Sequence, residues 1–326
     1  MHLIEHTHTP GNHCSSTAIS DLLRFHGVNW SEAFCLGLGG GLGVTYLCSP
    51  STLPSRILHT RSLGYEERFF KAIGVHNFKW ESSTVDSVCE KHLISAIKNN
   101  RPALILTDIY HLHYFNTKTH FPGHGIVVWG YDEHKQCFYV TDTERSNIET
   151  VSFASMRKAR KSNTPPFIYN GNLFSPKVIT APNNLDVVCS RAIIENALRL
   201  IDSKDKASGF LALSHCQDDL DKWRFDENWK WNCRLAYQTI EKRGTGGAGF
   251  RKMYAHFLGE AAQYLPSINT LKLQEKMVES ADKWFELSQA FKYASEQGTP
   301  DFSQVKHCIG KVIEKESEYC EKALLV

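Results

Sequence analysis

The sequence predicts an α+β N-terminal domain built on an antiparallel sheet, followed by an all-α C-terminal domain. An amphipathic helical pattern begins at residue 14, and apolar runs of strand length lie between residues 102 and 142. Helical periodicity then extends, with one break, from residue 185 to residue 324. The 326 residues are typical of two domains. We expect one domain over 1–165, a connector over 166–184 and a helical domain over 185–326.

The composition is that of an ordinary globular protein, with 42% apolar and 22% charged residues. Net charge is +2, and no dense basic run alternates with aromatic residues, so we expect no nucleic-acid partner. The longest apolar runs, such as 126–129, are far shorter than a membrane span, and no signal peptide is apparent at the N-terminus. These features predict a cytoplasmic protein without a membrane partner. Oligomeric state is left open, a homo-oligomer included.

The first predicted helix covers residues 14–27 and places Cys14 at its N-terminus. Its apolar residues fall on one face, and Gly27 supplies a stop; they are Ala18, Ile19, Leu22 and Leu23. A cysteine at a helix start lies near unpaired N–H groups and the positive end of the helix dipole, and both favour the thiolate. Cys14 is therefore a candidate nucleophile.

A glycine-rich stretch follows at residues 35–47. It matches no nucleotide-binding pattern, because Leu42 takes the last glycine position of a G-x-G-x-x-G beginning at Gly37 and no Gly-Lys-Ser/Thr follows. Two interpretations remain open. The glycines permit close backbone packing, or they form a loop that lets a substrate chain approach near Cys14.

Two helices over 62–74 and 87–99 and a buried strand over 102–108 are predicted next. A loop rich in aromatic residues and histidine follows over 109–122, and strands over 124–131 and 136–142 come after it. His124 opens the first of these two strands and Asp142 closes the second. Side chains alternate along a strand, so the two residues share a face only if the connecting loop has an odd length or a bulge interrupts the pairing.

A thiol at a helix tip, with a histidine and a carboxylate supplied by a distant sheet, is the arrangement of a papain-type active site. The sequence thus predicts a triad of Cys14, His124 and Asp142. A cysteine on a helix is more often a buried apolar residue, a histidine at a strand start is usually structural, and an aspartate at a strand end is commonly a turn residue. The position of Cys14 at the helix start and the glycines flanking His124 favour the catalytic interpretation.

Beyond residue 160 the composition changes. A basic run over 157–161 and prolines at 165, 166, 176 and 182 indicate an irregular connector. Helical patterns then cover 185–202, 207–222, 229–242, 250–264, 270–296 and 302–324, with a glycine-rich break over 243–251. The ten cysteines include no C-x-x-C pair and are expected to be free thiols. His6, His8 and Cys14 offer metal-binding atoms, but no second cysteine pair accompanies them, and we expect no metal site.

Several segments, taken together and in order, resemble the family of butirosin biosynthesis protein H. They are residues 12–18 with 22–23 and 26–27, 31–32, 37–43, Tyr46, 123–132, 140–142 and 243–254. The resemblance covers nearly the whole chain. It implies a papain-like fold, with its N-terminal nucleophile helix, for the catalytic domain over 1–165. It also implies acyl transfer, since the founding member moves an aminoacyl group from a carrier-protein thioester to an amine of an aminoglycoside.

The implied activity is that of an amide-forming N-acyltransferase in natural-product biosynthesis, including antibiotic biosynthesis. Cys14 would form the acyl-enzyme, His124 would move protons, and Asp142 would orient His124. No bound cofactor is expected; the phosphopantetheine arm of an acyl or peptidyl carrier protein would deliver the acyl group to a small-molecule amine. A cysteine hydrolase (peptidase, amidase or thioesterase) using the same triad is the alternative. A non-catalytic binding protein is a third interpretation.

The sequence departs from the papain-like pattern around the nucleophile. His8 stands six residues before Cys14, where papain-like peptidases place the glutamine of the oxyanion hole, and Thr143 follows Asp142 in place of proline. His8 or Asn12 is therefore a candidate oxyanion donor beside the backbone N–H of Cys14. Weaker candidates for substrate contact are Tyr110, Tyr114, Arg243 and Arg251, with core packing or a solvated surface as the alternative. We expect the basic run 157–161 to be a solvated linker. The alternative is that it contacts an acidic carrier protein.

Overall fold

The computed structural model describes residues 1–49, 53–162, 164 and 169–326. The chain forms two compact units, and each unit is discontinuous in sequence. Unit 1 comprises Met1–Glu32 and Gly74–Ala181, and unit 2 comprises Ala33–Ile73 and Pro182–Val326. These units differ from the predicted domain ranges in the segment 33–73, which packs with the C-terminal helices rather than with the sheet that carries His124.

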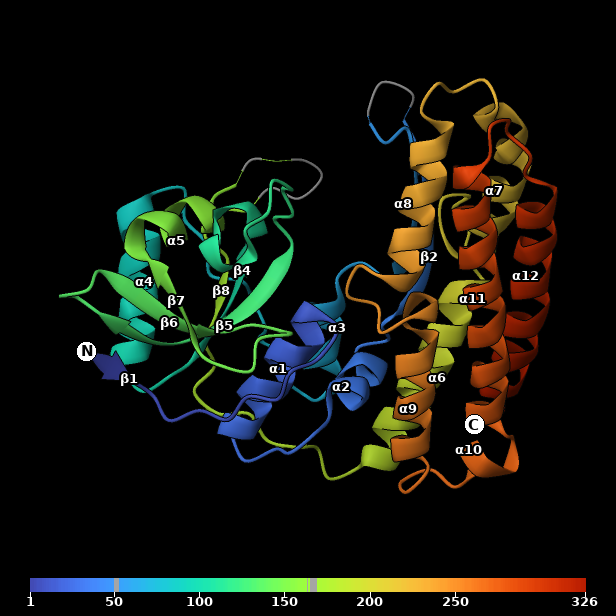
Figure 1. Ribbon diagram of the computed structural model, residues 1–326. Helices are drawn as coiled ribbons and strands as arrows, with labels where there is room; N and C mark the ends of the chain where they lie inside the picture. The colour runs from blue at the N-terminus through green and yellow to red at the C-terminus, as the bar shows by residue number, and fades with distance from the viewer. Residues whose placement is uncertain (50–52, 163, 165–168) are drawn as a thin grey trace. The chain divides into compact units, whose positions relative to one another are not determined.

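Unit 1 is built on an antiparallel sheet, as predicted for the N-terminal part of the chain. The sheet has the order β7-β6-β5-β4-β8, and β1 pairs with the far end of β5. Figure 1 shows β7, β6, β5 and β4 side by side. The strands are β1 (His2–Leu3), β4 (Ala103–Thr107), β5 (His124–Asp132), β6 (Cys137–Thr141), β7 (Glu149–Ser152) and β8 (Leu173–Phe174).

The helices of unit 1 begin near the predicted residues where the amphipathic pattern is clear. Helix α1 (Cys14–Phe25) packs on β5, and its residues from Ser15 to Leu23 are buried. The other helices are α4 (Asp86–Lys98), α5 (Phe153–Arg160) and two short 3₁₀ helices, η1 (Ile109–His111) and η2 (His113–Phe115). Helix α5 and the 3₁₀ helices occupy stretches expected to be irregular. Residues 157–160 of the basic run therefore lie on helix α5 rather than in a linker, and the predicted connector over 166–184 lies beyond this helix.

The hairpin of β5 and β6 contains the bulge that the triad prediction required. Asp132 pairs with Cys137 across a four-residue loop, and the register shifts by one residue between Val128 and Gly130. An even loop alone would place Asp142 on the opposite face from His124, and the bulge restores the shared face. Because Val127 pairs with Thr141, Asp142 follows beside Ile126. Asp142 therefore lies diagonal to His124 rather than directly across from it.

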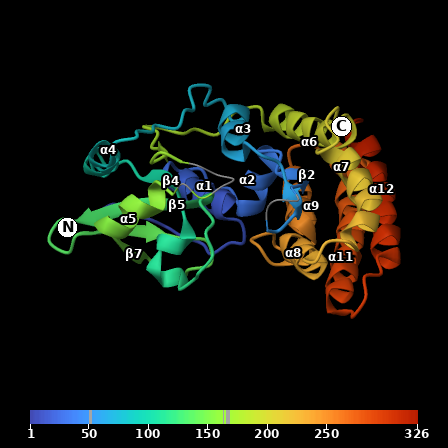
Figure 2. The same cartoon turned by 90° about the horizontal axis from the view of Figure 1, so that it is seen from above.

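Unit 2 joins a β-hairpin to the helical region predicted for the C-terminal part of the chain. Its hairpin consists of β2 (Leu42–Cys48) and β3 (Arg56–Arg61). Figure 2 shows α7 and α12 alongside one another, and α11 packs against α8, α9 and α12. The helices are α2 (Glu32–Leu38), α3 (Tyr65–Ala72), α6 (Leu185–Ile201), α7 (Gly209–Trp223), α8 (Trp229–Glu241), η3 (Ala248–Phe250), α9 (Arg251–Ala261), α10 (Ser267–Thr270), α11 (Leu273–Glu296) and α12 (Ser303–Ala323).

Hydrogen bonds hold the hairpin of unit 2 on the helices, which explains why segment 33–73 belongs to this unit. The Tyr46 hydroxyl donates to Asp219 of α7 at 2.7 Å, and Thr239 of α8 donates to the Leu58 carbonyl at 2.7 Å. Asn196 of α6 exchanges two bonds with the backbone of Leu42. The hairpin is thereby bonded to three helices, through residues at least 154 positions further along the chain.

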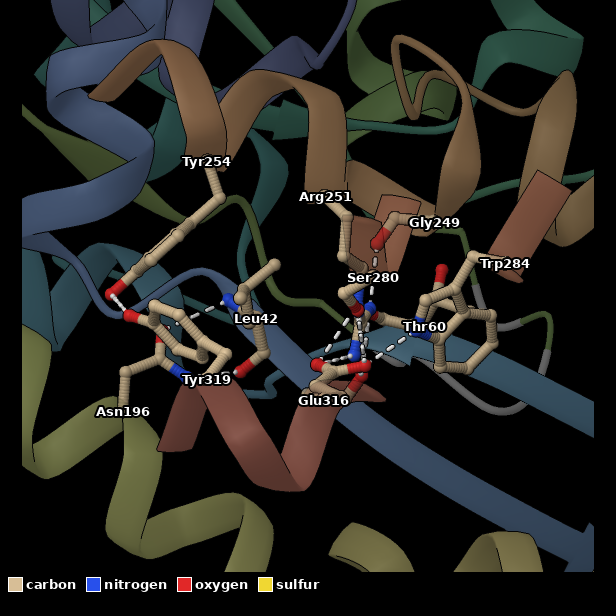
Figure 3. A network of polar contacts seen from close by, with 11 residues as sticks. Leu42, Thr60, Asn196, Gly249, Arg251, Tyr254, Ser280, Trp284, Glu316 and Tyr319 are labelled. Atoms are coloured by element: carbon tan, nitrogen blue, oxygen red, sulfur yellow. Dashed lines mark hydrogen bonds and ion pairs between the residues drawn. The ribbon is translucent and has the colours of Figure 1, made fainter. Parts of the chain in front are cut away.

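A buried ion pair lies at the centre of unit 2 (Figure 3). Arg251 and Glu316 are both fully buried, with 2.8 Å between Nη2 and Oε1. Arg251 also donates to the carbonyls of Gly43, Thr60 and Gly249. Its guanidinium lies 4.3 Å from the centroid of the Trp284 ring, whose Nε1 donates to Glu316. The guanidinium thus links β2, β3, α11 and α12.

The glycine-rich stretch forms the end of α2 and the start of β2, and its glycines serve packing within unit 2. A Cβ at Gly37 would overlap the Phe257 ring, and one at Gly39 would overlap the Tyr65 ring. Gly40 has a φ of +58°, and the Arg199 guanidinium donates to its carbonyl at 3.3 Å. These contacts confirm the packing interpretation for the three residues. Among the described helices, none combines the length and apolarity needed to cross a membrane.

Candidate active site

The turn before α1 is held by Glu32, a residue that the structure places beside the helix start. The Glu32 carboxylate accepts from the backbone N–H groups of Asn12 at 2.9 Å and His13 at 2.5 Å. It also accepts from the Thr17 hydroxyl at 3.0 Å and the Ser16 hydroxyl at 3.4 Å. His13 is the N-cap, and its Nδ1 accepts from the backbone N–H of Ser16. Charge-assisted bonds therefore fix the backbone on both sides of Cys14.

Two glycines allow α1 to approach the sheet closely. A Cβ at Gly125 would lie 3.3 Å from Ser15 Oγ, so the start of α1 lies against the start of β5. Gly11 donates its N–H to the Thr143 carbonyl at 2.8 Å, one residue beyond Asp142. A Cβ at Gly11 would overlap Thr17 Oγ1 at 2.2 Å. The turn that carries Cys14 is thus bonded to the segment that carries Asp142.

His124 and Asp142 form a buried pair. The distance from His124 Nε2 to Asp142 Oδ1 is 2.8 Å, and the two side chains are 8% and 1% exposed. Burial lowers the pKa of His124 because it disfavours the charged imidazolium. The Asp142 carboxylate and the Cys14 sulfur raise it by a larger amount, so the pKa of His124 rises to about 10. Burial would also raise the pKa of Asp142, yet the His124 imidazolium and the hydrogen bonds hold it below the ordinary value.

The Cys14 side chain lies beside His124 of this pair. It is partly exposed, whereas eight of the other nine thiols, all but the exposed Cys48, are buried. A hydrogen bond from its sulfur is one of the causes that raise the pKa of His124. Because Nε2 of His124 bonds to Asp142, Nδ1 is the nitrogen left for the Cys14 sulfur. The structure therefore brings Cys14, His124 and Asp142 together within unit 1.

Tyr114, a weaker candidate for substrate contact, bonds to the carboxylate of the pair. Its hydroxyl donates to Asp142 Oδ2 at 2.6 Å, and burial together with the nearby carboxylate raises the pKa of Tyr114. Arg145 supports this contact: it donates to the Tyr114 carbonyl at 2.9 Å, and its guanidinium lies 5.5 Å from the centroids of the Tyr114 and Phe115 rings. The Phe115 ring meets His124 edge to face at 5.1 Å. The aromatic loop thus packs against the pair itself.

Sequence reasoning missed Glu32, Arg145 and the role of Tyr114. Their partners lie 15 to 31 residues away along the chain, too far for a local pattern to reveal. Glu32 is among the residues that carry the family resemblance, and no other feature of the sequence indicated its role. Arg145 lies outside the segments that carry the resemblance, and no local pattern indicated its role.

The two candidate oxyanion donors are engaged with other carboxylates. His8 Nδ1 lies 2.6 Å from Asp21 Oδ2, and Asp21 lies two helical turns, about 10 Å, along α1 from Cys14. Asn12 donates through its side-chain amide to Glu32 at 3.4 Å. Neither side chain is therefore directed to the carbonyl of a substrate on Cys14. The backbone N–H of Cys14 is the remaining predicted donor.

The other candidates for substrate contact are engaged with protein groups of their own. Tyr110 is 45% exposed and stacks on His120, with 4.0 Å between ring centroids. Arg243 is exposed on unit 2 and donates to Gln238. Arg251 is the buried centre of unit 2, so the idea that it contacts substrate is wrong: its guanidinium donates only to protein groups among the described residues.

The basic run 157–161 contacts acidic side chains and carbonyls of unit 1. Arg157 lies 2.7 Å from Glu90 and Lys161 lies 2.6 Å from Asp86, both on α4. Arg160 is 3% exposed and donates to the carbonyls of Cys89 and Gly171. These contacts leave little free positive charge on the run for a carrier protein.

One group of metal-ligand side chains converges in the part of the chain that the structure describes, and it lies outside the predicted N-terminal set. It consists of Asp108, His111 and His120, whose ligand atoms lie within 4.8 Å of one another. His6 instead contacts the Ile4 carbonyl and packs on the Trp129 ring. With His8 bonded to Asp21, His6, His8 and Cys14 form no such group.

Two protein families match the chain. The family described as "Butirosin biosynthesis protein H, N-terminal" matches residues 13–143, which include Cys14, His124 and Asp142. A domain family of unknown function, DUF4872, matches residues 154–323, just over half of the chain. No curated protein matches the chain.

Proposed function

Because the chain belongs to the family of butirosin biosynthesis protein H, we propose that it is a biosynthetic enzyme, an amide-forming N-acyltransferase of antibiotic or related natural-product biosynthesis. It would take an acyl group from a thioester on a carrier protein and transfer it through Cys14 to a small-molecule amine. The observation that carries the proposal is the arrangement of a partly exposed thiol at the start of α1 beside the buried pair of His124 and Asp142.

The charges of the site favour a thiolate nucleophile. A His124 imidazolium that persists to a pKa of about 10 supplies a positive charge beside the sulfur at neutral pH. The N–H groups at the start of α1 add partial positive charge. Both stabilise the Cys14 thiolate, which is the reactive form toward a thioester.

The reaction would proceed in two balanced halves. The Cys14 thiolate attacks the acyl carbonyl, the bond from carbon to the pantetheine sulfur breaks, and His124 protonates the departing thiolate. The amine then attacks the acyl-enzyme, His124 takes a proton from the amine nitrogen, and the bond to Cys14 breaks to regenerate the thiolate. Asp142 fixes His124 and stabilises its charged form in both halves.

Hydrolysis by the same three residues is the second candidate function, since water in place of the amine would release the free acid. Packing of Tyr114 and Phe115 against the pair favours transfer, because a covered acyl-enzyme excludes water. A binding protein without activity is disfavoured by the intact triad geometry.

The test is intact-protein mass spectrometry after exposure to acyl thioesters of pantetheine, followed by a panel of amines. We expect one acyl adduct that maps to Cys14 and disappears as an amide forms. Cys14→Ala should reduce turnover by about 10³-fold or more, whereas Cys48→Ala, which removes another exposed thiol, should leave it unchanged. An adduct retained in Cys14→Ala would remove Cys14 from the mechanism. Free acid as the product with every amine would establish the hydrolase instead.

A further inference from the structure

The loop before His124 brings together three side chains whose chemistry the triad does not use. Asp108 immediately precedes η1 and is fully buried, and the N–H of His111 donates to the Asp108 carbonyl at 3.1 Å. In a 3₁₀ turn, residues three apart lie on the same side of the helix. The turn therefore places His111 on the same side as the Asp108 carboxylate.

His120, near the other end of the loop, contacts the same Asp108 carboxylate. Its Nδ1 lies 2.7 Å from Asp108 Oδ2, and the next backbone N–H, of Phe121, donates to Asp108 Oδ1 at 2.9 Å. Tyr110 stacks on the exposed face of the His120 ring at 4.0 Å between centroids. The His120 ring is thus held in place by a neighbouring aromatic residue and by the backbone that follows it.

We propose that Asp108, His111 and His120 form a binding site for a first-row divalent metal ion, with Zn²⁺ as the reference ion. The rings of His111 and His120 lie 6.0 Å apart between centroids. Two imidazoles on one ion, each with a metal–nitrogen distance of about 2.0–2.1 Å, place their centroids roughly 5–6 Å apart. Two imidazoles and one carboxylate, with a water as the fourth ligand, are a common donor set for Zn²⁺.

The ion would replace the proton that lies between His120 Nδ1 and Asp108 Oδ2, and that proton would leave to solvent. Ser162 donates to Asp108 Oδ2 at 2.6 Å and would orient the carboxylate from behind.

The site lies on the loop that carries Tyr114. His111 ends η1, the buried Leu112 follows, and Tyr114 of η2 donates to Asp142. An ion that joins His111 to His120 would restrict both ends of this loop. Its expected role is to rigidify the support of Asp142 rather than to contact substrate.

The test is metal binding by the full chain after removal of metal with a chelator. Calorimetric titration with Zn²⁺ should give one equivalent with a dissociation constant of about 1 μM or tighter, and Co²⁺ should give the visible spectrum of a four-coordinate site. His111→Ala and His120→Ala should each weaken binding by about 10-fold or more. His113→Ala changes an exposed histidine of the same loop outside the cluster and should bind as the unaltered chain does.

Cys14→Ser should retain the full equivalent of Zn²⁺, which separates this site from metal bound by the proposed nucleophile. Zn²⁺ should also raise the melting temperature of the unaltered chain and of His113→Ala, but not of His120→Ala. Absence of stoichiometric binding in the unaltered chain would overturn the proposal. Equal affinity in the His111, His120 and His113 variants would overturn it as well.

Discussion

Asp142 accepts hydrogen bonds from two side chains on separate oxygens, with His124 on Oδ1 and Tyr114 on Oδ2. Its own backbone carbonyl accepts from the N–H of Arg145 at 2.7 Å. The carboxylate is therefore fixed in its plane before any substrate arrives, and the imidazole it holds cannot rotate without breaking a charge-assisted bond. Preorganised acceptors of this kind act without reorganisation during reaction.

The raised pKa of His124 has a consequence for stability. The folded chain holds the His124 proton more strongly than the unfolded chain, so this contribution is fully present below the unfolded pKa near 6.5 and is lost as pH rises through about 10. Because the proposed Cys14 thiolate offsets this proton until the unfolded thiol ionises near pH 8.5, stability of the unaltered chain should fall between about pH 8.5 and about pH 10 more steeply than that of His124→Gln, by up to about 1.4 kcal/mol per pH unit. Urea unfolding across this range measures the two slopes.

His113→Gln serves as the control for this comparison, because it removes an exposed histidine of the neighbouring loop. Its slope should match that of the unaltered chain. Equal slopes in the unaltered chain and His124→Gln would show that the imidazolium is not held by Asp142 in the folded state.

At the scale of elements, the start of α1 depends on one carboxylate. Glu32 accepts two backbone N–H groups and two hydroxyls around the turn that presents Cys14. A neutral amide oxygen at this position would accept fewer and weaker bonds than a carboxylate, and its NH₂ group would face donors. The position of the sulfur relative to His124 is thus coupled to a residue 18 positions along the chain.

Glu32→Gln should lower the apparent free energy of unfolding by about 1–3 kcal/mol and should slow alkylation of Cys14 by iodoacetamide. Both effects arise because the turn loses its anionic acceptor while the volume of the side chain is kept. Glu5→Gln alters an exposed glutamate and should change neither quantity. Alkylation of Glu32→Gln at the unaltered rate would show that the carboxylate does not position the thiol.

The same scale explains what could be predicted from sequence. Cys14, His124 and Asp142 each lie at the end of an element with a clear apolar period, and alternation along β5 and β6 led to the expected bulge. Tyr114 and Glu32 act through partners distant in sequence, and nothing local distinguishes them from surface residues. Their roles emerge only from the packing of the loop and the turn.

Two segments could not be interpreted uniquely from the sequence, for a different reason. The glycines of segment 35–47 were compatible with a loop, because glycine gives no periodic signal, yet they permit close packing of α2 and β2. The basic run 157–161 resembled a linker because its charges suppress apolar periodicity. Two of its basic side chains, Arg157 and Lys161, contact acids on α4, which no pattern within the run could reveal.

At the scale of the whole molecule, each unit has its own buried charge centre. Unit 1 holds the pair of His124 and Asp142, and unit 2 holds the pair of Arg251 and Glu316. The second pair joins separate segments of unit 2, and both of its side chains are fully buried (Figure 3). We interpret it as the structural centre of the helical unit.

Arg251→Met should lower the apparent free energy of unfolding by about 3–5 kcal/mol, because it leaves Glu316 buried without a counter-charge. Urea denaturation followed by circular dichroism measures this loss. Arg251→Met combined with Glu316→Leu should recover part of it, since both charges are then removed.

The exposed pair of Arg234 and Glu296 provides the matched control in the same unit. Arg234→Met should cost less than about 1 kcal/mol. A loss for Arg251→Met as small as that for Arg234→Met would contradict a structural role for the buried pair.

The chain passes between the units at Glu32–Ala33, at Ile73–Gly74 and at Ala181–Pro182. Segment 33–73 therefore packs with the helices of unit 2, although in the sequence it lies between the two parts of unit 1. A recombination event at Ala181 alone would combine the β2–β3 hairpin of one protein with the C-terminal helices of another. An exchange of the whole helical unit between two such proteins therefore requires the coding segments for both 33–73 and 182–326.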